Sequence, residues 1–257
     1  MKICRFLAEN SLAPRFGVLD GDSIAEITAA PWSAPRVEKT GKSFSARSVK
    51  LGAPATPSKI VCVGRNYAAH AAELGNEVPK EPLIFLKPPS AIVGPGEPIL
   101  LPEFSSKVEH EGELGLVVGK RASRLSDDDD ALSYLCGYTC VNDVTARDLQ
   151  KSDVQFTRAK GFDTFCPVGP YIETELNPAD VSVECRVNGA TRQSGRTSLM
   201  IYSVAFLLRW ISRMMTLEAG DLIATGTPSG VGPLVAGDTV EVFVGGIGVL
   251  SNPVHSA

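Results

Sequence analysis

The sequence lacks the features that mark several large classes of protein. It has no apolar run of about eighteen residues, the length that a helix needs to cross a bilayer. Its 25 Lys and Arg residues are outnumbered by 29 Asp and Glu residues, so the net charge of −4 leaves no basic surplus for nucleic acid or an anionic membrane. The apolar core at the N-terminus is too short for a secretory signal. We therefore expect a cytoplasmic protein with no nucleic-acid or membrane partner.

Paired cysteines are also missing. The six cysteines are scattered, none forms a C-x-x-C pair, and most lie in apolar runs. We expect buried thiols in a reducing compartment rather than a disulfide framework. Cys136 and Cys140 allow a zinc site as an alternative, but no second pair accompanies them. The glycine-rich segment 225–232 lacks the lysine of a phosphate-binding loop, which argues against a nucleotide site.

The order of the expected elements indicates the fold class. Strand patterns predominate, and the regular alternation of strands and helices that is typical of a doubly wound sheet is absent. Between residues 29 and 57 the composition changes to Pro, Ser, Lys and Arg, and we expect a loose connection there. We predict a β-dominated α+β fold with a small β-rich N-terminal domain over 1–50 and a larger domain over 57–257. Strands are expected at 2–7, 15–19, 24–28, 59–63, 83–86, 108–119, 138–141, 169–173, 181–187 and 238–250, with hairpin turns at 20–22 and 188–189.

Three segments have helical patterns. Asn66 is expected to cap a short helix that ends at Gly75. Ser126 is expected to cap a helix that begins with four aspartates and runs to about residue 135. The best amphipathic helix spans 203–215, and its predicted core residues are Val204, Leu207, Leu208, Ile211, Met214 and Met215.

Residues 108–119 carry the most informative pattern. Glu109, Glu111 and Glu113 alternate, so a strand would place their carboxylates on one face and the following apolar residues on the other. Carboxylates held this close repel by roughly 4 kcal/mol per pair at 4 Å and an effective dielectric constant of about 20, unless a cation binds them. Oxygen ligands suit a hard divalent ion such as Mg²⁺, Mn²⁺ or Ca²⁺. The alternative is an edge strand with a solvated acidic face.

Three further polar signals lie elsewhere in the chain. Asp143 follows a buried strand, where a carboxylate projects into a site. His70 and Glu73 are three residues apart and share a helical face. Lys160 lies among apolar and glycine residues. Taken singly, the histidine is explained as a surface residue and the lysine as a surface side chain with a buried stem.

Six motifs in order connect these signals. They are Gly64-Arg65-Asn66-Tyr67, His70-x-x-Glu73, Glu111-Gly112-Glu113-Leu114-Gly115, Asn142-Asp143-x-Thr145-Ala146-Arg147-Asp148, Lys160-Gly161-Phe162-Asp163 and Thr225-Gly226-Thr227-Pro228. From about Pro57 to Leu250 the chain resembles the fumarylacetoacetate hydrolase family, and it looks closest to the short acylpyruvase and fumarylpyruvate hydrolase-like members. The resemblance implies a mixed β-sandwich roll that forms a homodimer.

The resemblance also implies roles for the polar residues. The ligands of a divalent ion, Mg²⁺ or else Mn²⁺ or Ca²⁺, would be Glu111, Glu113 and Asp143. His70 would be the base that activates water, and Glu73 would orient its ring. Further roles implied by the resemblance are a lysine that stabilises an oxyanion, Lys160, and residues that hold substrate oxygens, Arg65, Tyr67, Gln150, Thr225 and Thr227. The helix around His70 and the loop 76–82 would form a lid over the substrate.

Two charged features are left without a role in this scheme. Glu109 shares the phase of the other glutamates but lies outside the family motif, so we expect a solvated neighbour or a hydrogen-bond acceptor behind the ligands. Arg147 and Asp148 are expected to form a pair on a helix surface that contributes less than ~1 kcal/mol.

By resemblance, the chain is a divalent-metal hydrolase. It would cleave a C–C bond in an acylpyruvate or fumarylpyruvate-like 2,4-diketo acid and release pyruvate. The same ion would stabilise the enolate in other reactions of 2-oxo acids. The alternatives are therefore a decarboxylase or isomerase of aromatic meta-cleavage degradation, an oxaloacetate decarboxylase or tautomerase, and, in another class, a metal-binding module without catalysis.

Overall fold

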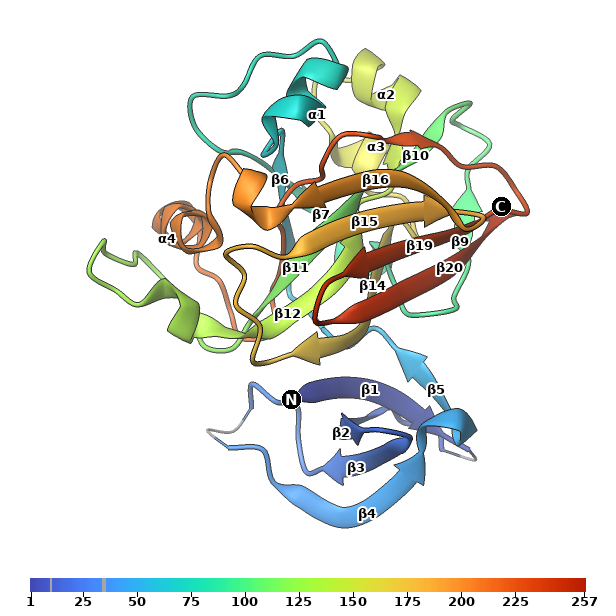
Figure 1. The fold of residues 1–257 in the computed structure, drawn as a ribbon, viewed down its shortest axis with the longest axis vertical. Coiled ribbons are helices and arrows are strands. Elements are labelled where there is room, and N and C mark those ends of the chain that lie inside the picture. Colours follow the sequence, from blue (N-terminus) through green and yellow to red (C-terminus); the bar gives the residue numbers. More distant parts are fainter. Residues whose placement is uncertain (10, 34–35) are drawn as a thin grey trace.

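The computed structural model describes residues 1–9, 11–33 and 36–257, and strands dominate it (Figure 1). The β-dominated α+β fold predicted from the sequence is confirmed. Four short α-helices are present in the part of the chain that the structure describes: α1 (Ala68–Glu73), α2 (Arg147–Ser152), α3 (Thr157–Lys160) and α4 (Val204–Met214). The 3₁₀ turns are Ala46–Ser48, Pro89–Ala91, Ala131–Tyr134 and Thr197–Leu199.

A large mixed sheet runs through the molecule. Its path is β4-β3-β2-β1-β14-β12-β11-β17-β6-β7, with β5 paired to β1 and β8 paired to β14. The N-terminal strands of this sheet are β1 (Lys2–Ala8), β2 (Arg15–Asp20), β3 (Ser23–Ile27), β4 (Lys39–Ser45) and β5 (Val49–Gly52). The others are β6 (Ile60–Gly64), β7 (Leu83–Lys87), β8 (Ile92–Val93), β11 (Gly112–Val118), β12 (Leu135–Asn142), β14 (Cys166–Glu173) and β17 (Leu222–Ala224).

A five-stranded sheet of order β16-β15-β19-β20-β9 packs on one face of the large sheet (Figure 1). Its strands are β9 (Ile99–Leu101), β15 (Ser182–Val187), β16 (Ala190–Arg196), β19 (Thr239–Val244) and β20 (Gly248–Ser256). The main hydrophobic core lies between the two sheets and includes Leu114, Leu116 and Val242. A small third sheet joins β10 (Val108–His110) to β13 (Thr145–Ala146) and β18 (Gly232–Pro233).

Strand β11 is not an edge strand, so the solvated alternative for the acidic stretch is wrong. It lies between β12 and β17, and all seven of its residues are buried. Leu114 and Leu116 face the main core as predicted, whereas Val117 belongs to a second apolar cluster on the opposite face. The acidic side chains are therefore inside the protein, where an uncompensated charge is costly.

Part of the predicted loose connection is folded. Residues 39–45 and 49–52 form β4 and β5, which pair with β3 and β1. In β4 only Phe44 is shielded from solvent, where its ring lies 5.2 Å from that of Phe6. An edge strand with so little apolar alternation gives a weak sequence signal. Residues 34 and 35 of the same segment lie outside the described residues.

The helix predicted for 127–135 is also wrong. The aspartate run forms turns, and only the 3₁₀ turn Ala131–Tyr134 follows it. Ser126 does not cap a helix with its hydroxyl; its N–H and hydroxyl donate to the carboxylate of Asp129, at 2.7 and 2.8 Å. Such local side-chain bonds compete with helix formation, which is why Asp is a poor residue inside a helix.

The predicted helix at 203–215 is confirmed as α4. Ser203 caps it by accepting a hydrogen bond from the N–H of Phe206. Four of the six predicted core residues are fully buried, but Met214 is 51% exposed and Met215 only packs against the edge of the core. The predicted turns at 20–22 and 188–189 join β2 to β3 and β15 to β16.

The parallel pair β6 and β17 starts at a buried aspartate, Asp221. Its carboxylate accepts hydrogen bonds from the N–H groups of Ser58, Lys59 and Glu218, at 2.9, 3.1 and 2.8 Å, and from the hydroxyl of Ser58 at 2.7 Å. The ammonium of Lys59 also pairs with it. This arrangement fixes where the two strands begin.

No helix in the described ranges is long and apolar enough to cross a membrane. The six cysteines are free thiols, and all except the half-buried Cys136 are buried, as expected. Among the described residues the only cluster of side chains suited to a metal ion is acidic and excludes Cys136 and Cys140, so the zinc alternative has no support.

Candidate metal and active site

Glu111 lies where the acidic stretch passes from one sheet to another. The predicted single strand 108–119 is two strands, because β10 pairs with β13 and β18 whereas β11 pairs with β12 and β17. The N–H of Glu111 donates to Oδ1 of Asn142 at 3.0 Å, and its carbonyl accepts from the N–H of Asp143 at 2.8 Å. These two bonds fix Glu111 beside the end of β12, which carries Asp143.

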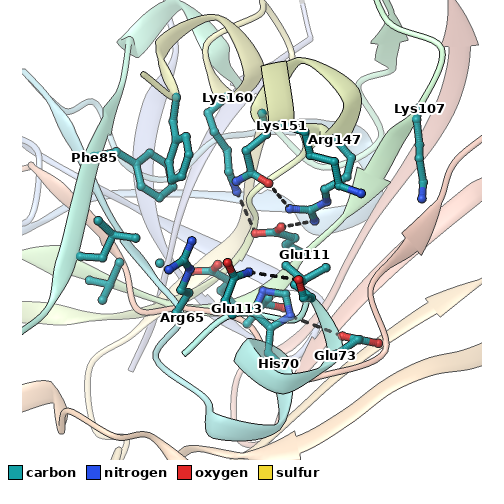
Figure 2. Close-up of a pocket in the computed structure, with 18 residues that line it drawn as sticks. Arg65, His70, Glu73, Phe85, Lys107, Glu111, Glu113, Arg147, Lys151 and Lys160 are labelled. Atoms are coloured by element: carbon teal, nitrogen blue, oxygen red, sulfur yellow. Dashed lines mark hydrogen bonds and ion pairs between the residues drawn. The ribbon is translucent and has the colours of Figure 1, made fainter. Parts of the chain in front are cut away.

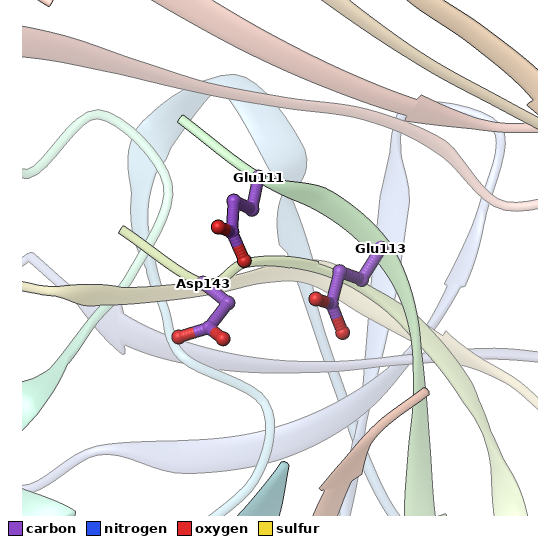
Figure 3. Close-up of side chains that lie close together, drawn as sticks. All are labelled: Glu111, Glu113 and Asp143. Atoms are coloured by element: carbon purple, nitrogen blue, oxygen red, sulfur yellow. The ribbon is translucent and has the colours of Figure 1, made fainter. Parts of the chain in front are cut away.

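The three predicted metal ligands converge. Glu111, Glu113 and Asp143 are at most 5% exposed, and each contributes an oxygen within 4.8 Å of the others (Figure 3). Glu111 and Glu113 come from the acidic stretch, and Asp143 directly follows the end of β12. The two segments meet because the antiparallel register of β11 and β12 brings Gly112 opposite Asn142. The alternation of the glutamates therefore produces a real cluster of carboxylates.

Buried cations surround this cluster. Nζ of Lys160 lies 2.8 Å from Oε2 of Glu111 (Figure 2) and 2.6 Å from Oδ2 of Asp143. Nζ of Lys87 lies 2.6 Å from Oδ1 of Asp143, and the guanidinium of Arg147 pairs with Glu111. Lys160 also lies over the ring of Phe85, and its ammonium is 5.0 Å from the ring centroid.

The predicted surface pair of Arg147 and Asp148 is wrong, and of the two roles expected for Glu109 the structure shows the hydrogen-bond acceptor behind the cluster. Arg147 is 2% exposed, and its Nε lies 2.6 Å from Oε2 of Glu109, which is itself buried. Asp148 does not pair with Arg147; it accepts hydrogen bonds from the Ser105 hydroxyl at 2.6 Å and the Ser106 N–H at 2.8 Å. Glu109 is therefore part of the buried charge network, and Arg147 is not a surface residue.

The neighbouring charges shift the pKa values of Glu111 and Glu113 in opposite directions. Burial alone would raise the pKa of Glu111, but the Lys160 and Arg147 cations outweigh it and hold the pKa well below its usual range. Burial and the nearby Asp143 and Glu111 carboxylates raise the pKa of Glu113 well above its usual value. Ionisation of all three carboxylates at once is thus disfavoured unless another cation is present. All three donors are oxygens, so the residues fit a hard divalent ion.

The imidazole of His70 reaches this site from α1. His70 is 4% exposed and lines the cavity described below, and its Nδ1 is 3.4 Å from Oε2 of Glu73 (Figure 2). Both oxygens of Glu73 also accept from the N–H of Gly230, at 3.0 and 3.1 Å. Glu73 is thus held from behind while it faces the histidine ring.

Asn66 does not cap α1, contrary to the prediction. The N-cap position is Tyr67, which makes no side-chain capping bond. The Asn66 amide instead donates to the carbonyls of Thr225 at 2.8 Å and Tyr202 at 3.1 Å, and its oxygen accepts from the Tyr202 N–H at 2.8 Å. Asn66 therefore joins the start of α1 to two distant segments, and only the tertiary fold reveals these partners.

One glycine-rich loop, residues 225–232, donates main-chain hydrogen bonds to Glu113 in the carboxylate cluster and to Glu73 beside the histidine. The N–H of Gly226 donates to Oε2 of Glu113 at 2.7 Å, and the N–H of Gly230 donates to Glu73. Gly230 has φ +101°, and a Cβ atom there would lie 2.1 Å from the carbonyl oxygen of Arg192. Glycine is therefore required at this position.

A cavity of about 440 Å³ opens over the carboxylates and the histidine. Apolar side chains form part of its wall, namely Val63, Leu74, Leu83, Phe85 and Phe156. Cationic side chains form another part, namely Arg65, Lys107, Arg147, Lys151 and Lys160. The site can therefore hold a small anionic molecule next to an imidazole and a carboxylate cluster.

The structure brings three of the five predicted substrate-binding residues to this cavity, namely Arg65, Gln150 and Thr227. Thr225 and Tyr67 do not line it. The hydroxyl of Thr225 donates to the carbonyl of Leu114 at 2.8 Å, so it is used within the fold. The Tyr67 hydroxyl is buried and has no hydrogen-bond partner among the described residues.

Part of the predicted lid contributes to the cavity wall, through His70, Glu73, Leu74 and Asn76. The loop after α1 is tied down where the Tyr202 hydroxyl donates to the carbonyl of Pro79 at 2.8 Å. Closure over a substrate stays a prediction.

Sequence reasoning missed Lys87, Lys107 and Lys151 and misplaced Arg147. Lys87 ends an apolar strand, where a lysine usually turns to solvent, and its partner Asp143 is 56 residues away. Lys107 and Lys151 carry no motif. The sequence carried one signal for the place of Arg147. It follows Asp143 closely and begins the helix after the strand end, α2.

Comparison with known proteins identifies the chain. The family model for the fumarylacetoacetate hydrolase C-terminal domain matches residues 59–255, and a model described as Rv2993c-like, N-terminal, matches residues 1–54. The chain belongs to the fumarylacetoacetate hydrolase family, and it is an enzyme of that family.

Relatives in this family are named for several reactions. The oxaloacetate tautomerase YisK of Bacillus subtilis is 44% identical over 88% of this chain and 80% of its own length. The structure of 5-carboxymethyl-2-hydroxymuconate delta-isomerase from Mycobacterium smegmatis is 45% identical, covers both chains fully and has a TM-score of 0.91. That of maleylpyruvate hydrolase from Sphingobium sp. SYK-6, in complex with manganese(II) and pyruvate, is 31% identical with full coverage of both chains and a TM-score of 0.81.

Proposed function

We propose that this enzyme binds a divalent ion, Mg²⁺ or else Mn²⁺ or Ca²⁺, on Glu111, Glu113 and Asp143 and acts on a 2-oxo acid. The support is the buried oxygen cluster, in which burial and the Asp143 and Glu111 carboxylates raise the pKa of Glu113. When bound, such an ion supplies Lewis-acid stabilisation of an enolate formed from the keto acid.

We infer that the reaction is an enolisation, the keto–enol conversion of a short 2-oxo dicarboxylic acid of the oxaloacetate type. The observation that carries this is the place of His70, a histidine that lines the cavity beside the carboxylates with Glu73 against its Nδ1. His70 would take a proton from the carbon next to the keto group and return it to the product. Glu73 would orient the ring and stabilise the imidazolium. The relatives named as tautomerase and isomerase support this choice.

The cationic wall of the cavity favours a substrate with a second carboxylate. Arg65 and Lys151 line the cavity and form no ion pair with any residue that the structure describes. Arg65 has φ +57°, a left-handed conformation that is unusual for a residue other than glycine and is concentrated at functional sites. We propose that these two residues, with Gln150, hold the oxygens of the substrate. Thr227 only forms part of the wall, because its hydroxyl donates to the carbonyl of Gly112 at 2.9 Å.

The second candidate is hydrolysis of a C–C bond in an acylpyruvate or fumarylpyruvate-like 2,4-diketo acid. The same His70–Glu73 pair would activate a water molecule, and Lys160 would stabilise the oxyanion. The observation that favours it is the likeness to a maleylpyruvate hydrolase. Against it stands the place of Lys160, whose ammonium contacts Glu111 and Asp143 and so is already engaged with the carboxylates. Decarboxylation of a 2-oxo dicarboxylic acid would use the same enolate.

An assay of the Mn²⁺-loaded enzyme on three substrates separates these candidates. The enol absorbance and the CO₂ release are followed with oxaloacetate, and pyruvate release with acetylpyruvate and fumarylpyruvate. We expect fast loss of the enol form, and a decrease of about 10² to 10⁴-fold in His70→Ala. His255→Ala, at an exposed residue near the C-terminus, is the matched control and should keep full activity.

Each result of this assay has a defined meaning. Release of pyruvate without acceleration of the enol conversion would establish the second candidate. Turnover of none of the three substrates would contradict the proposed function. The homodimer, the cytoplasmic location and the domain limits at 1–50 and 57–257 stay predictions.

A further inference from the structure

Lys87 contacts the proposed metal site from behind. It is the last residue of β7, its side chain is 0% exposed, and it is outside the lining of the cavity. Its Nζ lies 2.6 Å from Oδ1 of Asp143 and 3.1 Å from the carbonyl oxygen of Val144. A molecule in the cavity therefore does not touch Lys87, and any effect of this lysine on the reaction passes through Asp143.

The two oxygens of Asp143 have different surroundings. Oδ1 faces Lys87, which is enclosed by protein, whereas Oδ2 faces Lys160, which also contacts Glu111 and lines the cavity. Breaking the bond to Lys87 would leave its ammonium in the interior with only the Val144 carbonyl as a partner, which is strongly unfavourable. Oδ1 is thus tied to an inner cation, whereas the cation on Oδ2 lines the cavity and also contacts Glu111.

We propose that Lys87 is a positioning residue that reserves Oδ1, so that Asp143 offers a divalent ion only its Oδ2. This inference rests on the proposed metal site. A carboxylate binds Ca²⁺ through one oxygen or two, and Mg²⁺ requires six positions in near-octahedral geometry. Three carboxylates that each use one oxygen leave three positions, and a 2-oxo acid that chelates through its keto and carboxylate oxygens needs two of them. An Asp143 bound through both oxygens would compete for one of these positions.

The direct test is a crystal structure of the wild-type protein with Mn²⁺ and oxalate, which resembles a pyruvate enolate and has no further group. We expect Asp143 to contact the ion through Oδ2 alone, with Nζ of Lys87 still hydrogen-bonded to Oδ1. Contact of both Asp143 oxygens with the ion would overturn the proposal. If Mn²⁺ does not bind to the three carboxylates, the proposed metal site fails first, and the two failures are therefore distinguishable.

A solution test uses Lys87→Met, which removes the donor, and Lys87→Gln, which keeps one. Water-proton relaxation counts the exchangeable waters on bound Mn²⁺, and calorimetry gives the oxalate affinity of the loaded protein. We expect Lys87→Met to lose one water and to bind oxalate roughly tenfold more weakly or worse, with Mn²⁺ affinity undiminished because a positive charge has been removed. Lys87→Gln should restore the water count.

The matched control is Lys59→Met, which removes the lysine from Asp221, another buried aspartate. It should lower stability while leaving the water count and the oxalate affinity unchanged. A wild-type water count in Lys87→Met overturns the proposal, whatever the oxalate affinity. If Lys87→Met does not fold, the crystal structure of the wild-type complex decides.

Discussion

Two buried aspartates of this protein, Asp221 and Asp143, differ in what holds them. Both are at most 1% exposed, and both contact a lysine. Asp221 also accepts three backbone N–H groups and a serine hydroxyl. Among the residues that the structure describes, the Asp143 carboxylate is held only by two ammonium groups, from Lys87 and Lys160, and two more carboxylates lie beside it.

This difference separates a structural carboxylate from one that is available to a ligand. Backbone donors cannot leave Asp221 without unpairing the strand starts, so its environment is fixed by the fold. The environment of Asp143 consists of side chains and like charges, and an added cation would relieve the repulsion. Burial alone therefore does not indicate function; the chemical kind of the partners does.

The largest expected difference between variants of Asp143 and of Asp221 is in catalysis. Asp143→Asn in the Mn²⁺-loaded enzyme should lower kcat/KM by about 10³-fold or more, equivalent to about 4 kcal/mol of transition-state stabilisation, because one ligand charge is lost. Asp221→Asn should keep the turnover of the folded fraction within roughly threefold of wild type. Steady-state kinetics on the substrate found for the wild type measures both. Equal losses in the two variants would abolish the distinction.

The next contrast is in stabilisation by metal. At 100 times the dissociation constant, a bound ion adds about 2.7 kcal/mol to the free energy of unfolding, which is roughly 5–10 °C in melting temperature for a chain of this length. Mn²⁺ should raise the melting temperature of wild type and of Asp221→Asn alike, the latter from a lower start. Asp143→Asn should lose this rise, and EDTA should abolish it in the wild type and in Asp221→Asn. A full rise in Asp143→Asn would show that the ion binds elsewhere.

The smallest contrast is the pH dependence of Asp221. Burial would raise its pKa, but the bonds from Lys59, Glu218 and Ser58 outweigh it and lower the pKa below the usual value. A lowered pKa in the folded state means that the carboxylate stabilises the protein fully above the unfolded value of about 3.9, and that this contribution is lost as the pH falls through the lower folded value.

Urea unfolding of wild type and Asp221→Asn at pH 7, 5 and 3 tests this sign. The difference between them should be about 2 kcal/mol at pH 7, should persist at pH 5 and should shrink below pH 4. A difference that grows on acidification would contradict the assignment.

Local patterns in the sequence predicted the parts of the fold that depend on neighbours along the chain. The 3.6-residue period of 204–214 and the turn residues 20–22 and 188–189 describe burial and turns directly. The same reasoning failed at the aspartate run, where side-chain bonds to Ser126 replaced the helix, and at 39–45, where an exposed edge strand needs no alternation.

The candidate site was predictable in its carboxylate cluster but not in its counter-charges. The alternation in 108–119 and the family motifs led to Glu111, Glu113 and Asp143. Lys87 and Arg147 could not be assigned, because their partners are 56 and 36 residues distant and depend on which strands pair. The separation of β10 from β11 at Glu111 likewise follows from sheet pairing and not from any local signal.

The loop 225–232 holds Glu113 and Glu73 through main-chain N–H groups only four residues apart. Both donors belong to glycines with positive φ, and a Cβ atom at either would lie under 3.0 Å from a neighbouring atom, so these two positions cannot change. A single inserted or deleted residue between Gly226 and Gly230 would shift one donor relative to the other. Loop length, together with its two glycines, thus sets the placement of Glu73 relative to the carboxylate cluster.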